Sequence, residues 1–349
     1  MPNTMKGRNA IFVLLWLLAA LLGGFSARAA DGDEFYKGKQ ITLVVGAGAG
    51  GAADIYARAF APYFSTHIPG NPKIVIENMA GVGGVRVANY IFKSAPTDGT
   101  VIATSLSNVA TAPLLTPEGA NYDISQISWI GNLTKDSFVG YVWHSAPIQT
   151  LEQTRTKEVI MGASAVGAAG ADVAILAREL FGFKLKLVLG YPDSVSVKLA
   201  MEKGEVDGTF GNAWADLKNG HQDWLRDGTV RIIVQHGLER LHDLPDVPCL
   251  IEFAKTPDDR AAVELFAARQ EYSKPYFAPP GVPAERLAVL RRAFDATVRD
   301  PAFVQTAEQA HLELNDPLSG EELAARVNEV AKTSPAVVQR VINIFKHYK

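Results

Sequence analysis

Cysteine is almost absent from this sequence, since Cys249 is the only one in 349 residues. A lone cysteine excludes an intrachain disulfide, and it also excludes a pair of cysteines spaced to hold a metal. A chain without disulfides must be stabilised by its hydrophobic core, and one of this length can bury a large core. Cys249 lies between Pro248 and Leu250 in an apolar stretch, so we expect a buried, unreactive thiol.

Long apolar runs are also missing, because a helix that crosses a bilayer needs about 20 apolar residues. The longest run covers residues 11–22, after Lys6 and Arg8, and a Gly-Gly pair ends it. A small-x-small site follows at 27–29. This order is typical of a secretory signal peptide and argues against an uncleaved anchor. We therefore predict that residues 1–29 are removed and that the mature chain works in the periplasm.

Basic residues are not in excess, because 34 Lys and Arg stand against 37 Asp and Glu. Loss of residues 1–29 would remove Lys6, Arg8 and Arg28 and no acid, which moves the formal net charge from −3 to −6. Proteins that bind nucleic acids rely on a basic surface. We therefore predict no nucleic acid partner.

The sequence lacks recognisable catalytic and metal-binding motifs. The nearest approach to a G-x-S-x-G nucleophile elbow is GASAVG at 162–167, which is one residue too long. The seven histidines are scattered, and His236 and His242 are six residues apart, which is not a spacing of metal ligands. We therefore predict no enzyme activity, no cofactor and no metal.

Short β-branched runs alternate with longer helical patterns in two blocks of the chain. This alternation predicts mostly parallel sheets flanked by helices, in an α/β fold of two lobes. The expected strands are 41–45, 74–77, 101–104, 138–143, 159–162, 185–189 and 230–234, and the expected helices are 55–64, 85–92, 172–181, 195–203 and most of the tail from Pro283. We predict a first lobe of 30–138 and 235–349, a second lobe of 139–234, and two hinge crossovers. The LPDVP segment at 244–248 predicts a rigid extended connector.

Two glycine-rich loops follow successive predicted strands. The first reads GAGAGGAAD at 46–54 and the second reads NMAGVGG at 78–84, and each leads into a predicted helix. Such loops present unpaired backbone N–H groups at the positive end of a helix dipole, which suits an anion. Ligands of open α/β sheets bind at the carboxyl ends of strands, so both loops would line one cleft.

Small hydroxyl residues follow two other strands. Ser105 and Ser107 come after the third strand, and Ser164 lies in the loop after 159–162. Hydroxyls give directional hydrogen bonds to carboxylate oxygens. Serines in such loops also cap helices, so both interpretations stay open at this point.

The first glycine loop allows a second interpretation. Gly46, Gly48 and Gly51 form G-x-G-x-x-G after a strand, and Glu77 ends the next strand, where a dinucleotide site has its ribose-binding acid. Against this stand the signal peptide and the absence of a twin-arginine leader. An exported Rossmann-type NAD(P)-dependent oxidoreductase is therefore the alternative.

Six motifs in order make the sequence resemble the solute receptors of tripartite tricarboxylate transporters, also called Bug receptors. The resemblance covers nearly the whole mature chain and implies a two-lobed type II periplasmic binding protein fold without catalysis. The motifs are GGAAD at 50–54, ENMAGVGG at 77–84, PTDGT at 96–100, GEVDG at 204–208, LPDVP at 244–248 and FAPPGVP at 277–283.

The resemblance also implies ligand contacts from both lobes. These are Ala47, Gly48, Gly50, Gly51, Gly83, Gly84, Ser105 and Ser107 in the first lobe, and Ser164, Ala165, Gly167, Tyr191 and Asn212 in the second. The sequence departs from the family pattern after the first strand, where Gly46 and Ala47 replace a common Pro-aromatic pair. Arg86 stands where the family is usually apolar, and Trp214 follows Asn212 closely. Whether Arg86 or Trp214 contacts the ligand stays open.

We therefore expect a periplasmic receptor that captures a small organic anion, a carboxylate, between its lobes. Its partners would be this anion and the integral-membrane subunits of a tripartite tricarboxylate-type secondary transporter, and the receptor would be a monomer. A carboxylate-sensing protein without a transporter is a further alternative, because the membrane subunits would be encoded elsewhere.

Overall fold

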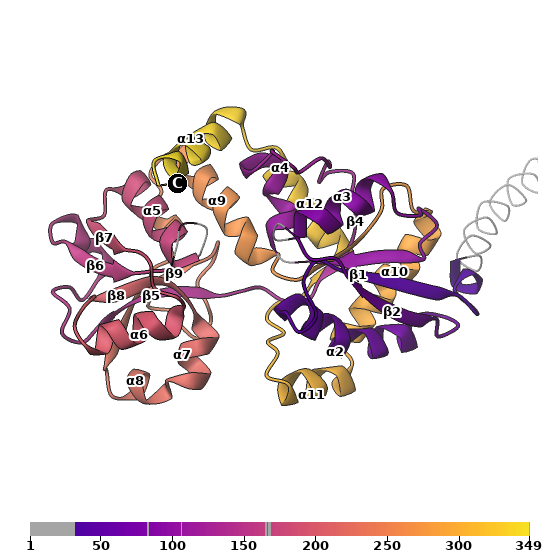
Figure 1. Cartoon of the computed structure of the whole chain (residues 1–349), viewed down its shortest axis with the longest axis horizontal. Coiled ribbons are helices and arrows are strands. Elements are labelled where there is room, and N and C mark those ends of the chain that lie inside the picture. The colour runs from indigo at the N-terminus through magenta and orange to yellow at the C-terminus, as the bar shows by residue number, and fades with distance from the viewer. Residues whose placement is uncertain (1–31, 82–83, 106, 165, 167–168, 349) are drawn as a thin grey trace, which may run out of the picture. The chain divides into compact units, whose positions relative to one another are not determined.

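A computed structural model describes residues 32–348 of the chain except 82–83, 106, 165 and 167–168 (Figure 1). The expected signal peptide and the proposed contacts Gly83, Ala165 and Gly167 lie outside the described residues. The chain forms two compact units, and each contains its own β-sheet. The first unit holds the described residues up to Ser105 with Gln126–Leu133 and Pro275–Ala324, and the second holds Leu106–Ser125, Thr134–Lys274 and Ala325–Lys349.

The sheet of the first unit has six strands in the order β11-β4-β10-β3-β1-β2. Strand β1 pairs in parallel with β2 and β3, while β10 pairs antiparallel with β3 and β4. The predicted strands at 41–45, 74–77 and 101–104 are confirmed. The apolar runs of β1 and β3 are largely buried, as in parallel sheets generally, whereas those of the edge strand β2 are only partly buried. The bounds are β1 Gln40–Val45, β2 Lys73–Asn78, β3 Val101–Thr104, β4 Ser128–Asn132, β10 Pro275–Ala278 and β11 Leu318–Ser319.

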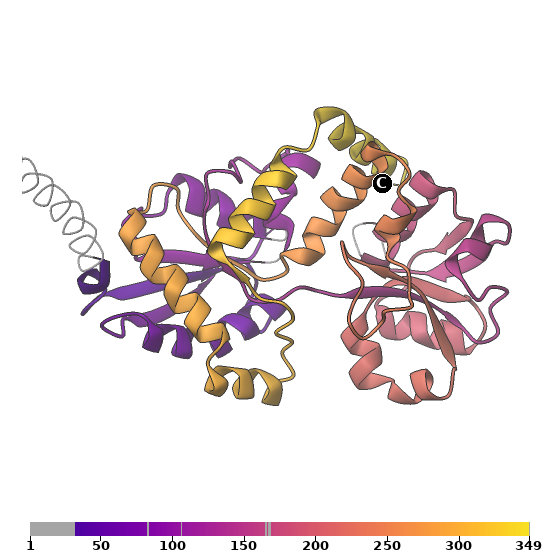
Figure 2. The same ribbon diagram turned by 180° about the vertical axis from the view of Figure 1, so that it is seen from behind.

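An aromatic cluster packs the helices of the first unit onto its sheet. Phe60 of α2 is fully buried, and its ring centroid lies 4.7 Å from that of Tyr276 in β10 and 5.4 Å from that of Phe294 in α10. Figure 2 shows α10 running along this unit. The helices are α2 Ala52–His67, α3 Val85–Lys93, α10 Ala284–Val298, α11 Pro301–Gln309 and the start of α12 Gly320–Ala331.

The sheet of the second unit has five strands in the order β7-β6-β8-β5-β9. Strand β6 is parallel to β7 and β8, and β5 is antiparallel to β8 and β9. The strands predicted in this part of the chain are confirmed. The bounds are β5 Phe138–Trp143, β6 Val159–Gly162, β7 Leu185–Val188, β8 Gly208–Ala213 and β9 Val230–His236.

Helices cover both faces of this second sheet, with α5 on one face and α6, α7 and α8 on the other (Figure 1). Residues of α9 and Cys249, which is buried as expected, belong to the core on the α5 face. Within the described residues, no helix combines the length and the apolar character needed to cross a membrane. The helices are α4 Ala112–Leu115, α5 Ala169–Phe181, α6 Ser194–Glu202, α7 Trp214–Gly220, α8 Gln222–Arg226, α9 Pro257–Glu271 and α13 Pro335–Lys346, with short 3-10 turns η2 Ser107–Ala110, η3 Leu151–Arg155 and η4 Leu250–Phe253.

The division into units differs from the expected lobe boundaries in four segments. Residues 106–125, 134–138, 235–274 and 325–349 belong to the second unit, although they were expected in the first lobe. The reason is packing, because Val263 and Phe266 of α9 join the core beneath β6 and β9, and α13 packs on α9. The spacing of strands along a sequence does not reveal such packing.

The segment 244–248 is not the extended connector that its prolines predicted. Backbone hydrogen bonds from Leu244 to Leu241 and from Val247 to Leu244 form turns there. The buried side chain of Gln235 in β9 holds these turns, because its Nε2 donates to the carbonyl oxygens of Leu244 and Val247 at 2.9 and 2.6 Å. A buried amide that needs partners has thus shaped the segment.

Candidate ligand-binding site

The first glycine loop lies at the carboxyl edge of the first sheet. Val45 at the end of β1 pairs with Asn78 of β2 and with Thr104 of β3, so the three strands end together. The loop after β1 enters α2, whose N-cap is Gly51 without a side-chain cap. The loop after β2 enters α3, whose N-cap is Gly84, and Ser105 directly follows β3. This arrangement places two helix N-termini at one edge, where an anion is stabilised.

Three amides of the first loop are used within the protein. The N–H of Gly46 donates to Thr104 O at 2.9 Å, that of Gly51 to Gly48 O at 3.0 Å, and that of Gly50 to Asp54 Oδ2 at 2.8 Å. The other N–H groups of the loop are those of Ala47, Gly48 and Ala49. None of the three has a hydrogen-bond acceptor among the described residues. Three consecutive unpaired donors next to a helix N-terminus form a cradle for a carboxylate.

Asp54 fixes the shape of this loop from the first turn of α2. Its side chain is 2% exposed, and it accepts hydrogen bonds from Arg58 Nε and Asn78 Nδ2, each at 2.8 Å. Asn78 also donates to Ala47 O at 3.0 Å. The Arg58 hydrogen bond, with those of Gly50 and Asn78, lowers the pKa of Asp54 to about 2 despite the burial that raises it. The carboxylate is therefore ionised and acts as a fixed acceptor for the loop.

Glycine at position 46 has a steric reason. A Cβ on Gly46 would lie 2.6 Å from Ser105 Oγ and 2.8 Å from Val87 Cγ1, so only glycine fits. Ser105 is fully buried beside Gly46, and its Oγ has no hydrogen-bond partner among the described residues.

Arg86 is exposed, and its Nη1 donates to Ala80 O at 3.4 Å, so its side chain lies along the second loop.

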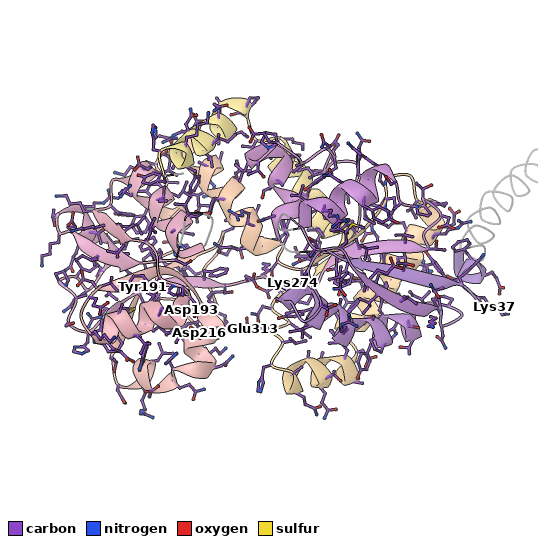
Figure 3. The ribbon with its side chains drawn as sticks, in the orientation of Figure 1. Lys37, Tyr191, Asp193, Asp216, Lys274 and Glu313 are labelled. Carbon is purple, nitrogen blue, oxygen red and sulfur yellow. The ribbon has the colours of Figure 1, made fainter. Side chains whose placement is uncertain are left out.

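The edge of the second sheet gathers the other expected contacts. Gly190 N donates to Ser164 O at 2.8 Å, which joins the loop after β6 to the loop after β7. Tyr191 is half-buried and packs over the end of β6, because its Cε2 lies 3.3 Å from where a Cβ of Gly162 would stand. Asn212 is buried near the end of β8, and its Nδ2 donates to Asp216 Oδ2 of α7 at 2.6 Å. Figure 3 labels Tyr191 and Asp216.

Two further side chains at this end of the sheet already make hydrogen bonds within the protein. Trp214 begins α7, is half-buried against the core, and donates from Nε1 to Asp243 Oδ2 at 3.4 Å. His236 Nε2 lies 2.7 Å from Phe210 O, and because a carbonyl only accepts, this nitrogen carries the proton. Burial lowers the pKa of His236 to about 4, so the ring is neutral near pH 7. Its Nδ1 has no partner among the described residues.

Sequence reasoning missed Arg269, a cation at the same edge. Its Nε donates to Asn108 Oδ1 at 3.2 Å, and its Nη1 lies 3.4 Å from Asp172 Oδ2 in the first turn of α5. The side chain of Arg269 is 26% exposed and that of Asp172 is 6% exposed, so Asp172 offsets part of the charge. Arg269 lies in α9, and the sequence does mark where this helix begins. Thr256 caps α9 by accepting a hydrogen bond from Asp259 N, and Pro257 follows as the first helical residue.

Residues 68–342 match the family described as the tripartite tricarboxylate transporter family receptor, TctC. A UPF0065 protein of Bordetella bronchiseptica is 23% identical over 297 residues, which are 82% of this chain and 81% of that protein. A TctC solute-binding protein from Polaromonas, solved without ligand, superposes with a TM-score of 0.68 at 19% identity and covers 88% of this chain and 99% of its own.

Two solved structures with ligands are also similar. MatC from Rhodopseudomonas palustris with bound malate has a TM-score of 0.53 at 20% identity, over 88% of this chain and 98% of its own. Rpa4515 of R. palustris with adipate has a TM-score of 0.54 at 21% identity, over 88% and 96%. These likenesses confirm the α/β fold of the periplasmic binding proteins. The family match covers more than half of the sequence, so the chain belongs to the TctC family of tripartite tricarboxylate transporter receptors, which are solute-binding proteins and not enzymes.

Proposed function

We propose that this receptor binds a small organic carboxylate and that the N–H groups of Ala47, Gly48 and Ala49 hold the carboxylate. The observation that carries the proposal is this row of three unpaired donors at the N-terminus of α2. Membership of the family agrees with it, and two related structures hold malate and adipate, which are both carboxylates. Charge from Lys or Arg is not needed, because aligned amides create a local positive field.

The other expected contacts take different roles in this proposal. Gly50 and Gly51 shape the loop, because their own N–H groups are used inside it. The contacts proposed beyond the cradle are Gly83, Gly84, Ser105, Ser107, Ser164, Ala165, Gly167, Tyr191 and Asn212.

We further propose that the receptor works as a monomer in the periplasm and delivers its ligand to the membrane subunits of a tripartite transporter. The leader-like pattern of residues 6–29 and the family support this assignment. The intact mass of the protein from a periplasmic extract tests export. We expect a mature chain that begins at Ala30, and a full-length chain retained in the membrane fraction would contradict it.

The dinucleotide interpretation has less support. In the first sheet the antiparallel strand β10 lies between β3 and β4, whereas a Rossmann sheet continues in parallel. The space beside Gly46 is filled by Ser105 and Val87. We therefore use NAD(H) only as a control ligand.

A thermal-shift screen of the purified mature protein tests the carboxylate proposal. The panel contains mono-, di- and tricarboxylates, aromatic acids, amino acids, sugars and NAD(H). A ligand that binds only the folded state at a hundredfold excess over its Kd stabilises it by about 2.7 kcal/mol. We expect one class of carboxylate to raise the Tm, and we expect sugars and NAD(H) to leave the Tm unchanged. A shift with NAD(H) or a sugar alone would refute the proposal.

A further inference from the structure

An exposed isoleucine lies in the first turns of α2, close to the loop with the free amides. Ile55 is 45% exposed, and no other large apolar side chain in the described part of the first unit is comparably exposed. Its N–H donates to Gly51 O at 3.0 Å, so Ile55 belongs to the helix that begins at this N-cap. Whether its exposure matters for binding depends on where the side chain lies relative to the free amides.

The position of Ile55 in the helix directs its side chain towards those amides. In an α-helix the Cα–Cβ bonds tilt towards the N-terminus, and a side chain covers the turn that precedes it. That turn leads back through Gly51 to the free N–H groups of residues 47–49. An apolar residue at this fourth helical position often packs on the residue before the N-cap, but here that residue is Gly50, which has no side chain. The side chain of Ile55 is therefore open beside the donors.

The other side chains around the free amides are small and apolar. Residues 46–53 carry only hydrogen atoms or methyl groups as side chains. The polar side chains that follow in α2 make hydrogen bonds within the first unit. Asp54 accepts from Arg58 Nε at 2.8 Å, and the hydroxyl of Tyr56 donates to Glu313 O at 3.1 Å. Beside the carboxylate, a ligand at this loop therefore meets mainly carbon atoms.

The buried hydroxyl of Ser105 is a second sign of a ligand at this loop, and it does not depend on the amides. Ser105 is fully buried, and its Oγ has no hydrogen-bond partner among the described residues. The hydroxyl lies against the loop, because a Cβ on Gly46 would stand 2.6 Å from this oxygen. Buried hydroxyls in proteins usually have a partner. A carboxylate oxygen, directly or through a water molecule, would supply one here.

We infer that Ile55 packs against the carbon chain of the ligand and that the receptor prefers apolar carboxylates over hydroxy acids and dicarboxylates of the same shape. This inference rests on the proposed function, because it takes the free amides of residues 47–49 as the carboxylate site. It narrows the substrate class to monocarboxylates with an apolar chain. A hydroxyl or a second carboxylate placed beside Ile55 would lose its hydration without gaining a hydrogen-bond partner.

Calorimetric titration with matched acids tests the inference. In each pair an apolar group replaces a polar group of nearly the same shape. The pairs are 3-methylbutanoate and 3-hydroxybutanoate, 4-methylpentanoate and succinate, and 5-methylhexanoate and glutarate. We expect the wild type to bind the apolar member of at least one pair about tenfold more tightly than the polar member.

Ile55→Ala should remove most of this preference. The substitution deletes three carbon atoms that the ligand would cover, so the Kd of the preferred apolar acid should rise about tenfold, while the Kd of its polar partner changes by less than about twofold. Alanine is a strong helix former, so α2 should remain intact. Ile55→Leu keeps the apolar surface and should retain the preference.

Leu199→Ala is the matched control. Leu199 lies in α6 of the second unit, is 49% exposed, and has no part in the donor loop. This variant should leave every Kd within about twofold of the wild type. Far-UV circular dichroism and Tm establish that each variant is folded.

The outcomes separate the inference from the proposed function. A wild type that binds carboxylates but prefers no apolar member of these pairs would overturn the inference and leave a carboxylate receptor. A preference for succinate or glutarate would also assign the second carboxylate to a cation such as Arg58 or Arg86. An apolar preference that survives in Ile55→Ala, or that Leu199→Ala lowers equally, would overturn the inference as well. A wild type that binds none of these acids and no other carboxylate of the thermal-shift panel would overturn both.

Discussion

In the loop after β1, the described N–H groups that remain free for a ligand are those of Ala47, Gly48 and Ala49. At the end of β8 the polar groups belong to side chains, and Asn212 Nδ2 donates to Asp216 Oδ2, which also accepts from Lys198 Nζ. The first set depends on the path of the backbone, which side-chain substitutions alter only indirectly. The second depends on two neighbouring side chains and changes with either. Side-chain substitutions should therefore change the hydrogen bonds to an anion at the first edge only through the path of the loop, whereas a single substitution at the second edge rearranges its polar groups.

The largest expected effect comes from filling the space beside the donor loop. Gly46→Ala places a methyl group 2.6 Å from Ser105 Oγ in a closed environment, so β1 or β3 must shift. We expect a loss of about 2 kcal/mol in the free energy of unfolding, measured by urea denaturation, together with weaker carboxylate binding.

Gly48→Ala is the matched control for this substitution. No atom lies within 4 Å of a Cβ built on Gly48, and its φ is not in the left-handed region. Stability should change by less than about 0.5 kcal/mol. Equal losses for Gly46→Ala and Gly48→Ala would show that loop flexibility, and not the contact with Ser105, determines the result.

A smaller effect is expected when the acid that shapes the donor loop is removed. Asp54→Ala leaves the Gly50 N–H and one N–H of Asn78 Nδ2 without their acceptor, and we expect a loss of about 2 kcal/mol or less in stability. The pKa of Asp54 in the folded protein is about 2, below its usual value of 3.8. Its contribution is therefore present above about pH 4 and is lost as the pH falls towards 2.

Urea denaturation of the wild type and Asp54→Asn at several pH values tests this dependence. The stability difference between the two proteins should shrink between pH 5 and pH 2. A difference that is constant over this range would mean that the charge of Asp54 does not hold the loop.

Salt should have only a modest effect on ligand affinity. If backbone amides close to the ligand provide the attraction, raising NaCl from about 0.05 to about 0.5 M should change the Kd by less than about threefold, because short-range contacts are screened less than exposed charges. A Kd that rises tenfold or more would indicate that a cationic side chain, and not the backbone amides, provides most of the attraction. Arg269 would then be the first candidate.

The smallest effect is expected at Arg86. Its exposed side chain follows the second loop and donates to Ala80 O. Arg86→Gln should change stability by less than about 0.5 kcal/mol, and the Kd for the carboxylate by less than about twofold. A large loss of affinity without a loss of stability would instead make Arg86 a ligand contact and weaken the contrast between the two edges.

Much of the fold followed from the sequence, because short β-branched runs and the helical patterns between them are local signals. They placed β1, β2 and β3 and the loops between them correctly. Helix α9 was missed although Thr256 and Pro257 mark its start. Its place in the second unit depends on Val263 and Phe266 packing on a sheet formed far away in the sequence.

The candidate site was less predictable than the fold. The glycine-rich segment 46–51 predicted a loop of free amides, but which amides remain free depends on the hydrogen bonds that Gly46, Gly50 and Gly51 make in the folded chain. The family resemblance predicted Asn212 as a ligand contact. The orientation of its carboxamide depends on Asp216 and on Lys198, and α6 must first pack beside α7 for these side chains to meet.

The most direct test of the central claim follows the amides themselves. A ¹H–¹⁵N TROSY spectrum of the mature protein labelled with ¹⁵N-alanine and ¹⁵N-glycine would be titrated with the acid that gives the largest thermal shift. The account predicts that the amide protons of Ala47, Gly48 and Ala49 move downfield as they donate to the carboxylate, while Gly50, already bonded to Asp54, moves little. Saturable binding that leaves the three amides of 47–49 unchanged would contradict the account.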